Sequence, residues 1–238
     1  MGLIGGSYAK ALRRLGVKKI IGVDTDGKVL RQAQEQAVID EALCGAGPGL
    51  QAADVVICSV YPAATLDFVK SAVPFLQSDV LITDATGIKG SLPEDVQRLL
   101  TGRMEFIAGH PMAGRQGSGL GMSQAEIFDG ANYIVVPAAF NSSGAIEWLS
   151  SFAGAIGCGQ VVQVDAVEHD RIIAYTSNLP HALAVALINS ASYNENTKYF
   201  IAGSFRDGTR VADINPYLWS DLFLACLLYT SPSPRDCS

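Results

Sequence analysis

The chain has 238 residues, of which 49% are hydrophobic and 17% are charged. This balance is typical of a globular protein and excludes an intrinsically disordered one, and the length allows one large domain or two modest ones. The formal net charge is -6 and the basic residues are scattered, which argues against a nucleic-acid partner because phosphate binding needs clustered lysines and arginines.

Membrane and redox features of the sequence indicate a soluble, cytoplasmic protein. The most apolar stretch, Leu179–Ile188, is too short to span a bilayer, and no signal-peptide pattern opens the chain. The five cysteines form no CxxC pair, show no zinc spacing and are odd in number. We therefore expect reduced thiols, no structural disulfide, no metal site and no membrane partner.

The first residues match the second half of a dinucleotide-binding fingerprint, G-x-G-x-x-G. Gly2 and Gly5 take the places of the second and third glycines, and an apolar helical face follows at Ala9, Leu12 and Leu15. The strand and first glycine that normally precede this turn are missing, which indicates a misassigned start or a truncated reading frame. The residues expected to bind the cofactor here are Gly2, Leu3, Ile4 and Gly5.

An acidic residue follows at the spacing that such a site requires. Residues 19–23 form a short apolar run that ends at Asp24, roughly 20 residues beyond the glycines, where a carboxylate binds the ribose 2′-hydroxyl of NAD. It would repel the 2′-phosphate of NADP, and no arginine follows until Arg31, so the sequence favours NAD. The alternative is that Asp24 is an ordinary turn residue.

Strands and helices alternate through the first 164 residues. Apolar runs predict strands at 53–60, 79–84, 106–108, 132–136 and 160–164, and helices are predicted at 28–36, 64–74 and 142–156. The alternation predicts an α/β fold, a Rossmann-like doubly wound parallel sheet without its first strand, with ligands at the carboxyl ends of the strands. Asp84, Lys89 and His110 fall at or just beyond such ends.

Residues 109–119 are interpreted as the catalytic loop. His110 lies between a glycine and a proline at the end of an apolar run, and four glycines allow close approach of a ligand. The imidazole pKa lies near neutrality, so His110 suits proton transfer. The alternative is a turn that contains an ordinary hydrogen-bonded histidine.

After Asp165 the pattern changes to helices. One begins near Asp165, an apolar one follows Pro180, and a third is predicted over residues 215–225. We therefore expect a dinucleotide-binding domain at 1–164 and an incomplete, all-α domain for substrate binding and dimerisation at 165–225. Residues 226–238 are expected to be a non-native tail, because 226–236 resemble the translation of a sequencing-library adapter; the alternative is a disordered Ser-Pro tail. His169 is expected on a charged helix surface.

Five stretches carry a resemblance to a known family. They are GLIGGS at 2–7, DATGIK at 84–89, GHPMAG at 109–114, LPHA at 179–182 and SFRDGTR at 204–210. On these motifs the chain resembles the bacterial prephenate dehydrogenases of tyrosine biosynthesis, from residue 1 to about residue 225. The histidine stretch together with the arginine-rich stretch is specific, whereas the glycines and Asp24 indicate only a dinucleotide.

The resemblance implies an activity and a set of site residues. The activity is NAD-dependent oxidation of prephenate, in which loss of the ring carboxylate gives 4-hydroxyphenylpyruvate, and the full-length form is expected to be a homodimer. His110 would accept the proton of the ring hydroxyl, and Arg210 would pair with a substrate carboxylate. Further substrate contacts are implied for His181, Arg206 and Thr86, and cofactor contacts for Ser59 and Lys89.

The chain departs from the family pattern at one position. Family members often have a serine that contacts the substrate hydroxyl where Gly87 stands here, and Thr86 beside it is the candidate replacement. Other interpretations are an arogenate dehydrogenase, another dehydrogenase of the β-hydroxyacid type, and a dinucleotide-sensing module without turnover, against which His110 and Arg210 together argue. Because elements are expected to be missing at both ends, this chain is expected to be poorly stable and weakly active or inactive.

Overall fold

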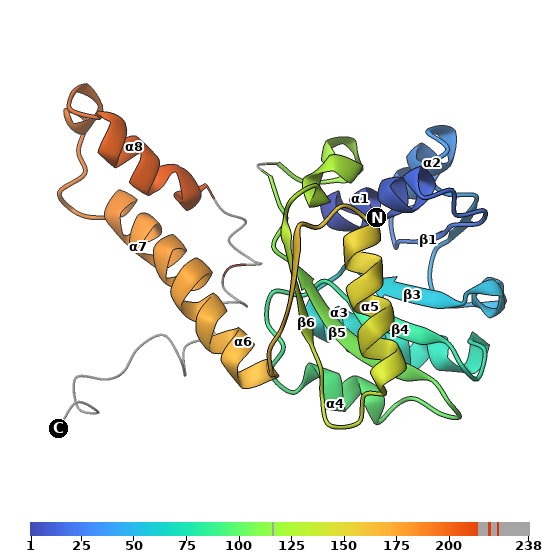
Figure 1. The fold of residues 1–238 in the computed structure, drawn as a ribbon. Coiled ribbons are helices and arrows are strands. Elements are labelled where there is room, and N and C mark those ends of the chain that lie inside the picture. Colours follow the sequence, from blue (N-terminus) through green and yellow to red (C-terminus); the bar gives the residue numbers. More distant parts are fainter. Residues whose placement is uncertain (116, 214–218, 220–222, 224–238) are drawn as a thin grey trace. The chain divides into compact units, whose positions relative to one another are not determined.

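The computed structural model describes residues 1–115, 117–213, 219 and 223. The chain divides into two compact units, Met1–Ala166 and Val167–Ser238, and the sequence places this boundary at Asp165. The first unit alternates strands and helices, and the described part of the second is helical (Figure 1). The predicted fold class, a Rossmann-like α/β unit followed by helices, is confirmed.

The first unit contains every strand and helix predicted for it, with ends shifted by a few residues. The helices are α1 (Leu3–Arg14), α2 (Gly27–Glu35), α3 (Pro62–Ala72), α4 (Leu92–Gln97) and α5 (Ser143–Ala155). The strands are β1 (Ile21–Val23), β2 (Glu41–Leu43), β3 (Val55–Cys58), β4 (Leu81–Asp84), β5 (Glu105–Pro111), β6 (Asn132–Val136) and β7 (Gln160–Gln163). Short 3-10 turns lie at Pro48–Ala52, Val73–Phe75, Leu120–Met122 and Ala125–Phe128. Only β2 and α4 were not predicted, and both are short.

The strands form two sheets. β1 and β2 pair in parallel as a two-stranded sheet, and the larger sheet has the order β3-β4-β5-β6-β7. Strands β3, β4 and β5 are parallel as predicted, but β6 is antiparallel to β5 and β7 is parallel to β6. The described residues of the connection from β5 to β6, all but residue 116, contain 3-10 turns and no α-helix, whereas a helical crossover usually joins parallel strands.

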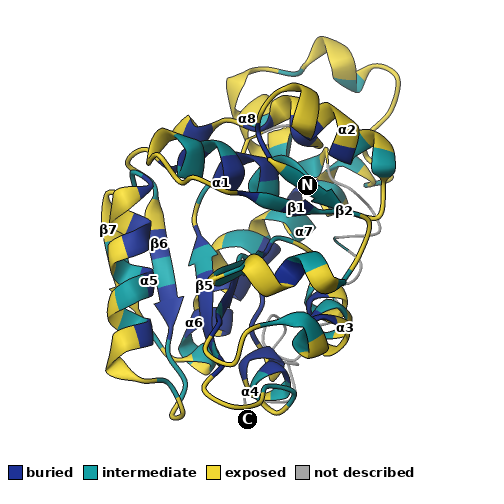
Figure 2. Ribbon diagram, turned by 90° about the vertical axis from the view of Figure 1, so that its right-hand side faces the viewer, coloured by how far each residue is buried: buried dark blue, intermediate teal, exposed yellow. Residues whose placement is uncertain are grey.

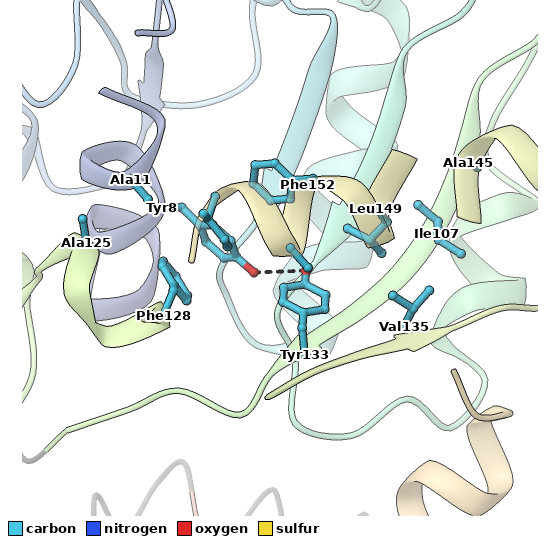
Figure 3. Close-up of a cluster of buried hydrophobic side chains, with 12 residues drawn as sticks. Tyr8, Ala11, Ile107, Ala125, Phe128, Tyr133, Val135, Ala145, Leu149 and Phe152 are labelled. Atoms are coloured by element: carbon cyan, nitrogen blue, oxygen red, sulfur yellow. Dashed lines mark hydrogen bonds between the residues drawn. The ribbon is translucent and has the colours of Figure 1, made fainter. Parts of the chain in front are cut away.

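Helices cover both faces of the larger sheet, as buried strands require. One face packs against α1 and α5, whose buried side chains include Tyr8, Leu149 and Phe152 (Figure 3). The opposite face packs against α3 and α4 through Val69 and Val96. Helix α5 crosses in front of the sheet in Figure 1, and Figure 2 shows the buried positions concentrated on β5 and β6. The central strand β5 is therefore enclosed by side chains on both faces.

The second unit begins with a nearly continuous helical segment. It comprises α6 (Ala166–Ile173), a π-helical turn (Ala174–Asn178), α7 (Leu179–Ile188), α8 (Gly203–Thr209) and 3-10 turns at Thr197–Tyr199 and Arg210–Ala212. Helix α7 packs against α8 and against the turn that starts at Arg210. Most of the helix predicted at 215–225, and the whole tail at 226–238, lie outside the described residues. None of the described helices is both long and apolar enough to cross a membrane.

Candidate active site

His110 lies in a strand and not in the predicted loop. Strand β5 continues through Pro111 because β6 pairs with it there, with His110 opposite Ile134. On the other side the β4–β5 pairing ends earlier, at Ile107 opposite Thr83. The histidine is half-buried, so it combines the fixed backbone of a central strand with partial access at the carboxyl end of β4.

Gly109, which precedes this histidine, packs against a pair of buried tyrosines. A Cβ atom added at Gly109 would lie 2.5 Å from the hydroxyl oxygen of Tyr133, closer than real Cβ contacts come. That hydroxyl is 3.1 Å from the hydroxyl of Tyr8. Burial raises the pKa of both tyrosines well above the usual value, so both remain neutral. Position 109 therefore requires glycine because of its neighbour and not because of an unusual backbone conformation.

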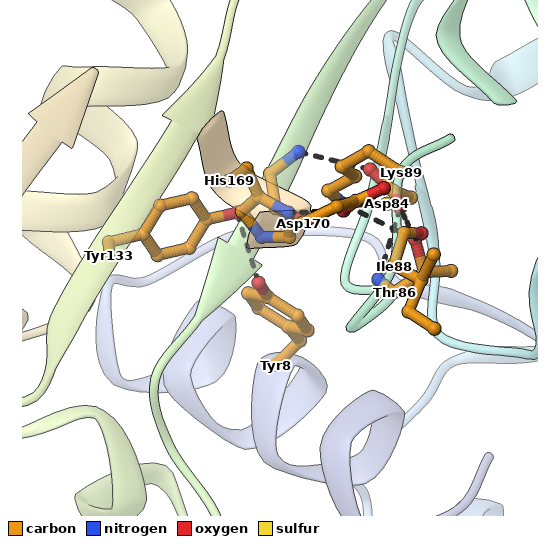
Figure 4. A network of polar contacts seen from close by, with 9 residues as sticks. Tyr8, Asp84, Thr86, Ile88, Lys89, Tyr133, His169 and Asp170 are labelled. Carbon is orange, nitrogen blue, oxygen red and sulfur yellow. Dashed lines mark hydrogen bonds and ion pairs between the residues drawn. The ribbon is translucent and has the colours of Figure 1, made fainter. Parts of the chain in front are cut away.

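Asp84 is the centre of a buried polar network at the end of β4 (Figure 4). Its Oδ2 accepts hydrogen bonds from the amide of Thr86 at 3.0 Å, from the Thr86 hydroxyl and from Nζ of Lys89 at 2.7 Å. Its Oδ1 accepts from the amide of Gly109 at 3.0 Å. Lys89 Nζ also donates to the Gly109 carbonyl at 2.7 Å, and the side chains of Asp84 and Lys89 have no exposed surface.

This network engages the polar atoms of two predicted site residues. The Thr86 hydroxyl contacts Asp84 and the carbonyl of Ile88, and it lies 3.3 Å from Lys89 Nζ. The ammonium group of Lys89 is directed into the unit, whereas a lone lysine after a strand is usually solvated. The Thr86 hydroxyl and the Lys89 ammonium group are thus engaged inside the unit, and the predicted substrate contact of Thr86 and cofactor contact of Lys89 stay predictions.

The amino end of α1 has the geometry predicted for phosphate binding. Gly2 is the N-cap without a side-chain hydrogen bond, and the first intrahelical bond runs from the Gly6 amide to the Gly2 carbonyl. The amides of Leu3, Ile4 and Gly5 thus have no intrahelical acceptor. Next to them, Ser59 at the end of β3 has its Cβ 3.4 Å from a Cβ added at Gly5, and its buried hydroxyl forms no hydrogen bond with the described part of the chain. The structure therefore brings the predicted cofactor residues 2–5 and Ser59 together.

Asp24 lies beside the same helix start. It follows β1, and its carboxylate contacts the amino group of Met1 and accepts a hydrogen bond from the Asp26 amide at 2.8 Å. Burial alone would raise the pKa of Asp24, but these hydrogen bonds outweigh it and lower the pKa, so the carboxylate is ionised at neutral pH. An ionised acceptor near the glycines is the arrangement that recognises a ribose hydroxyl.

The other predicted substrate residues lie in the second unit. His181 is in the first turn of α7, where its Nδ1 donates to the Ser177 carbonyl at 2.8 Å, and its ring stacks on Trp219 with centroids 3.7 Å apart. The two contacts fix the ring plane and the tautomer. Arg206 and Arg210 are exposed, so their guanidinium groups are accessible to an anion.

The interpretation of His169 as a surface residue is wrong. The side chain is buried, and its Nδ1 is 2.7 Å from a carboxylate oxygen of Asp170. His169 and the apolar Ile173 are four residues apart and therefore share one buried side of α6. The charged residues next to His169 in sequence led to the wrong prediction of an exposed position.

The sequence of each unit matches one of the two domains of a known protein family. Residues 8–162 match the nucleotide-binding domain of prephenate dehydrogenase, and residues 165–227 match its dimerization domain. The chain belongs to the prephenate dehydrogenase family. The family predicted from the five motifs is thereby confirmed.

The chain matches its relatives in the prephenate dehydrogenase family over part of their length. The chain is 32% identical to the prephenate dehydrogenase of Bacillus subtilis, over 94% of this chain and 62% of that one. It thus spans about three-fifths of that relative's length. Among solved structures it is similar to A. aeolicus prephenate dehydrogenase in complex with hydroxyphenyl propionate and NAD+, with a TM-score of 0.86, 30% identity and coverage of 96% of this chain and 81% of the other. It is also similar to Synechocystis arogenate dehydrogenase, with a TM-score of 0.82, 27% identity and coverage of 99% and 85%.

Gly87, the departure from the prephenate dehydrogenase pattern, lies beside the histidine. A Cβ atom added there would lie 3.8 Å from both Cε1 and Nε2 of His110, an ordinary contact. A small side chain at position 87 would therefore contact the imidazole without a clash. The sequence predicted Asp84 only as a residue at a strand end and Gly109 only as one of four loop glycines, and it predicted nothing for Tyr133. The position of Asp84 at the end of an apolar run could have indicated a role at the site. No sequence signal indicated that Tyr133, 24 residues beyond Gly109, packs against that glycine.

Proposed function

We propose that the protein is an NAD-dependent dehydrogenase that converts prephenate to 4-hydroxyphenylpyruvate in tyrosine biosynthesis. The observation that carries the proposal is the placement of His110, half-buried at the carboxyl end of β4, in a chain of the prephenate dehydrogenase family. The related A. aeolicus enzyme, with hydroxyphenyl propionate and NAD+ bound, supports the same substrate class and cofactor.

The residues at the amino end of α1 fit a dinucleotide. The amides of Leu3, Ile4 and Gly5 offer donors to a pyrophosphate, as does the Ser59 hydroxyl, which has no hydrogen-bond partner among the described residues. The ionised Asp24 offers an acceptor to a ribose hydroxyl. The same carboxylate would repel a 2′-phosphate, which supports NAD over NADP. Bound NAD supplies the hydride acceptor, and loss of the ring carboxylate as CO2 leaves an aromatic product.

The substrate residues have distinct roles in this proposal. The imidazole of His110 accepts the proton of the ring hydroxyl as the hydride leaves the carbon that carries it. The exposed guanidinium of Arg210 pairs with a substrate carboxylate, and Arg206 offers a second cation on the same helical segment. His181, whose Nδ1 donates to a backbone carbonyl, presents Nε2 as a hydrogen-bond acceptor when neutral.

The assembly and compartment are part of the same proposal. The match of residues 165–227 to a dimerization domain supports a homodimer. The free thiols of Cys44, Cys58 and Cys158 support a reducing compartment, the cytoplasm.

The test is NADH formation with purified chain, prephenate or arogenate, and NAD or NADP. The expected result is turnover with prephenate and NAD that is lost in His110→Asn. Preference for arogenate would favour the second candidate, an arogenate dehydrogenase, which the similarity to the Synechocystis structure supports. Tight NADH binding with no turnover on either substrate would refute both and favour a dinucleotide-sensing module.

A further inference from the structure

The backbone next to His110 lies where the regular sheet ladder stops on one side. Strand β4 ends at Asp84, and its pairing with β5 reaches only Ile107. Two residues further along β5, the amide and the carbonyl of Gly109 face the β4 side of the strand. No residue of β4 is available there to pair with them. In a buried strand these two groups need other partners.

Two side chains supply those partners. Oδ1 of Asp84 accepts from the Gly109 amide at 3.0 Å, and Nζ of Lys89 donates to the Gly109 carbonyl at 2.7 Å. The two side chains are themselves joined at 2.7 Å and fully buried. The carbonyl that Lys89 binds belongs to the peptide group that continues into His110. Both bonds involve a member of the Asp84–Lys89 ion pair, and such charge-assisted bonds are stronger than ordinary backbone bonds.

We propose that the Asp84–Lys89 pair positions His110 for proton transfer by holding the amide and the carbonyl of Gly109, the residue before it, in place of a missing strand partner. Both are positioning residues, and Lys89 acts on the backbone of the base and not on the cofactor. The catalytic part of this inference rests on the proposed function, which makes His110 the base. The structural part, that the pair fixes the position of the imidazole, does not depend on the proposed function.

The test replaces both charges at once, so that no unpaired buried charge remains. Asp84→Asn with Lys89→Met keeps an acceptor for the Gly109 amide but removes the donor to the Gly109 carbonyl. The matched control is Asp79→Asn with Arg103→Met, an exposed ion pair at the opposite ends of the same two strands, with 3.4 Å between its charged atoms. Lys89→Arg is the conservative variant, because it keeps a cation at this position.

Two measurements separate positioning from simple stability. At a temperature where all variants are folded, the first double variant should lose about 100-fold in kcat while KM for NAD changes less than twofold, since a small misplacement of a catalytic group costs on that order. The control should keep kcat, and Lys89→Arg should recover part of it. A lowered Tm with kcat within twofold of the parent would overturn the proposal.

The second measurement does not need turnover. The imidazole resonances of His110, assigned by loss in His110→Asn, should form one sharp set in the parent and become broadened or doubled in the first double variant. Those of His181 should stay unchanged as an internal reference. Unchanged His110 resonances would overturn the proposal. If the parent shows no turnover, the proposed function fails, and this measurement still decides whether the pair fixes the histidine.

Discussion

Replacing Gly109 by alanine tests the packing beneath the candidate base. The added methyl group would lie 2.5 Å from the Tyr133 hydroxyl oxygen and 3.0 and 3.1 Å from two of its ring carbons. The strand cannot easily move away, because both backbone groups of Gly109 are held by Asp84 and Lys89. Tyr133 is fully buried, so its ring has little room to turn. The variant must therefore strain one of these elements.

The expected cost in folding free energy combines two effects. Overpacking a well-packed core by one methyl group costs about 1–3 kcal/mol. If movement of Tyr133 relieves part of the clash, its hydrogen bond to Tyr8 is also lost, which adds about 0.5–1.5 kcal/mol. A total of roughly 2–4 kcal/mol follows, which for a protein of this size lowers Tm by roughly 5–15 °C.

The assay is thermal and urea-induced unfolding followed by circular dichroism. The matched control is Gly154→Ala on the exposed side of α5, where an added Cβ meets nothing within 4 Å. Because alanine favours a helix over glycine, the control should stabilise the protein by about 0.5–1 kcal/mol. The two substitutions should thus have opposite signs.

A double-variant cycle identifies the atom responsible. Tyr133→Phe removes the oxygen that comes within 2.5 Å, so the cost of Gly109→Ala should fall by about 1 kcal/mol or more in that background. The packing argument is refuted if Gly109→Ala is as harmless as the control, or if its cost is the same in the Tyr133→Phe background as in the parent.

Four further outcomes are expected. His110→Asn should lower kcat by about 100- to 10,000-fold with little change in KM, as loss of a general base does, and a few-fold effect would contradict that role. Arg210→Ala should raise KM for prephenate roughly 10- to 100-fold, the range for a hydrogen bond to a charged group, and an unchanged KM would exclude the carboxylate contact. Asp24→Ala should erode the preference for NAD over NADP in kinetic assays, and an unaltered preference would assign the discrimination to another residue. Finally, the raised pKa values of Tyr8 and Tyr133 mean that stability is complete below the unfolded value of about pH 10 and is lost as pH rises above it; Tyr8→Phe with Tyr133→Phe should flatten this slope in unfolding titrations.

Elements with strong local signals were predictable from the sequence. The polar helix α2 begins at Asp26, whose carboxylate accepts from the Lys28 amide, and α5 begins at Ser142, whose hydroxyl accepts from the Ala145 amide. Strand β6 matches its predicted bounds because its apolar run ends at a proline. Its direction was not predictable, since an apolar run reads the same for a parallel and an antiparallel strand.

Site residues were predictable where their chemistry depends on their own neighbours in sequence. The glycines and Asp24 have a required spacing, and the structure brings them to one helix start. Lys89 lacked such a signal. Whether a lysine after a strand is solvated or buried depends on what faces it, and here the facing groups are Asp84 and the carbonyl of Gly109, which is 20 residues away in sequence.

The sheet topology explains how the proposed catalytic histidine can lie inside a strand. A loop would leave the imidazole mobile, whereas a fully paired strand would bury it. In this protein β5 is paired through His110 by β6 on one side, while β4 ends early on the other. The early end of β4 leaves the amide and carbonyl of Gly109 without a strand partner, and the Asp84–Lys89 pair satisfies both groups. On the proposed positioning role, an antiparallel strand and a buried ion pair together hold one half-buried residue at the end of a neighbouring strand.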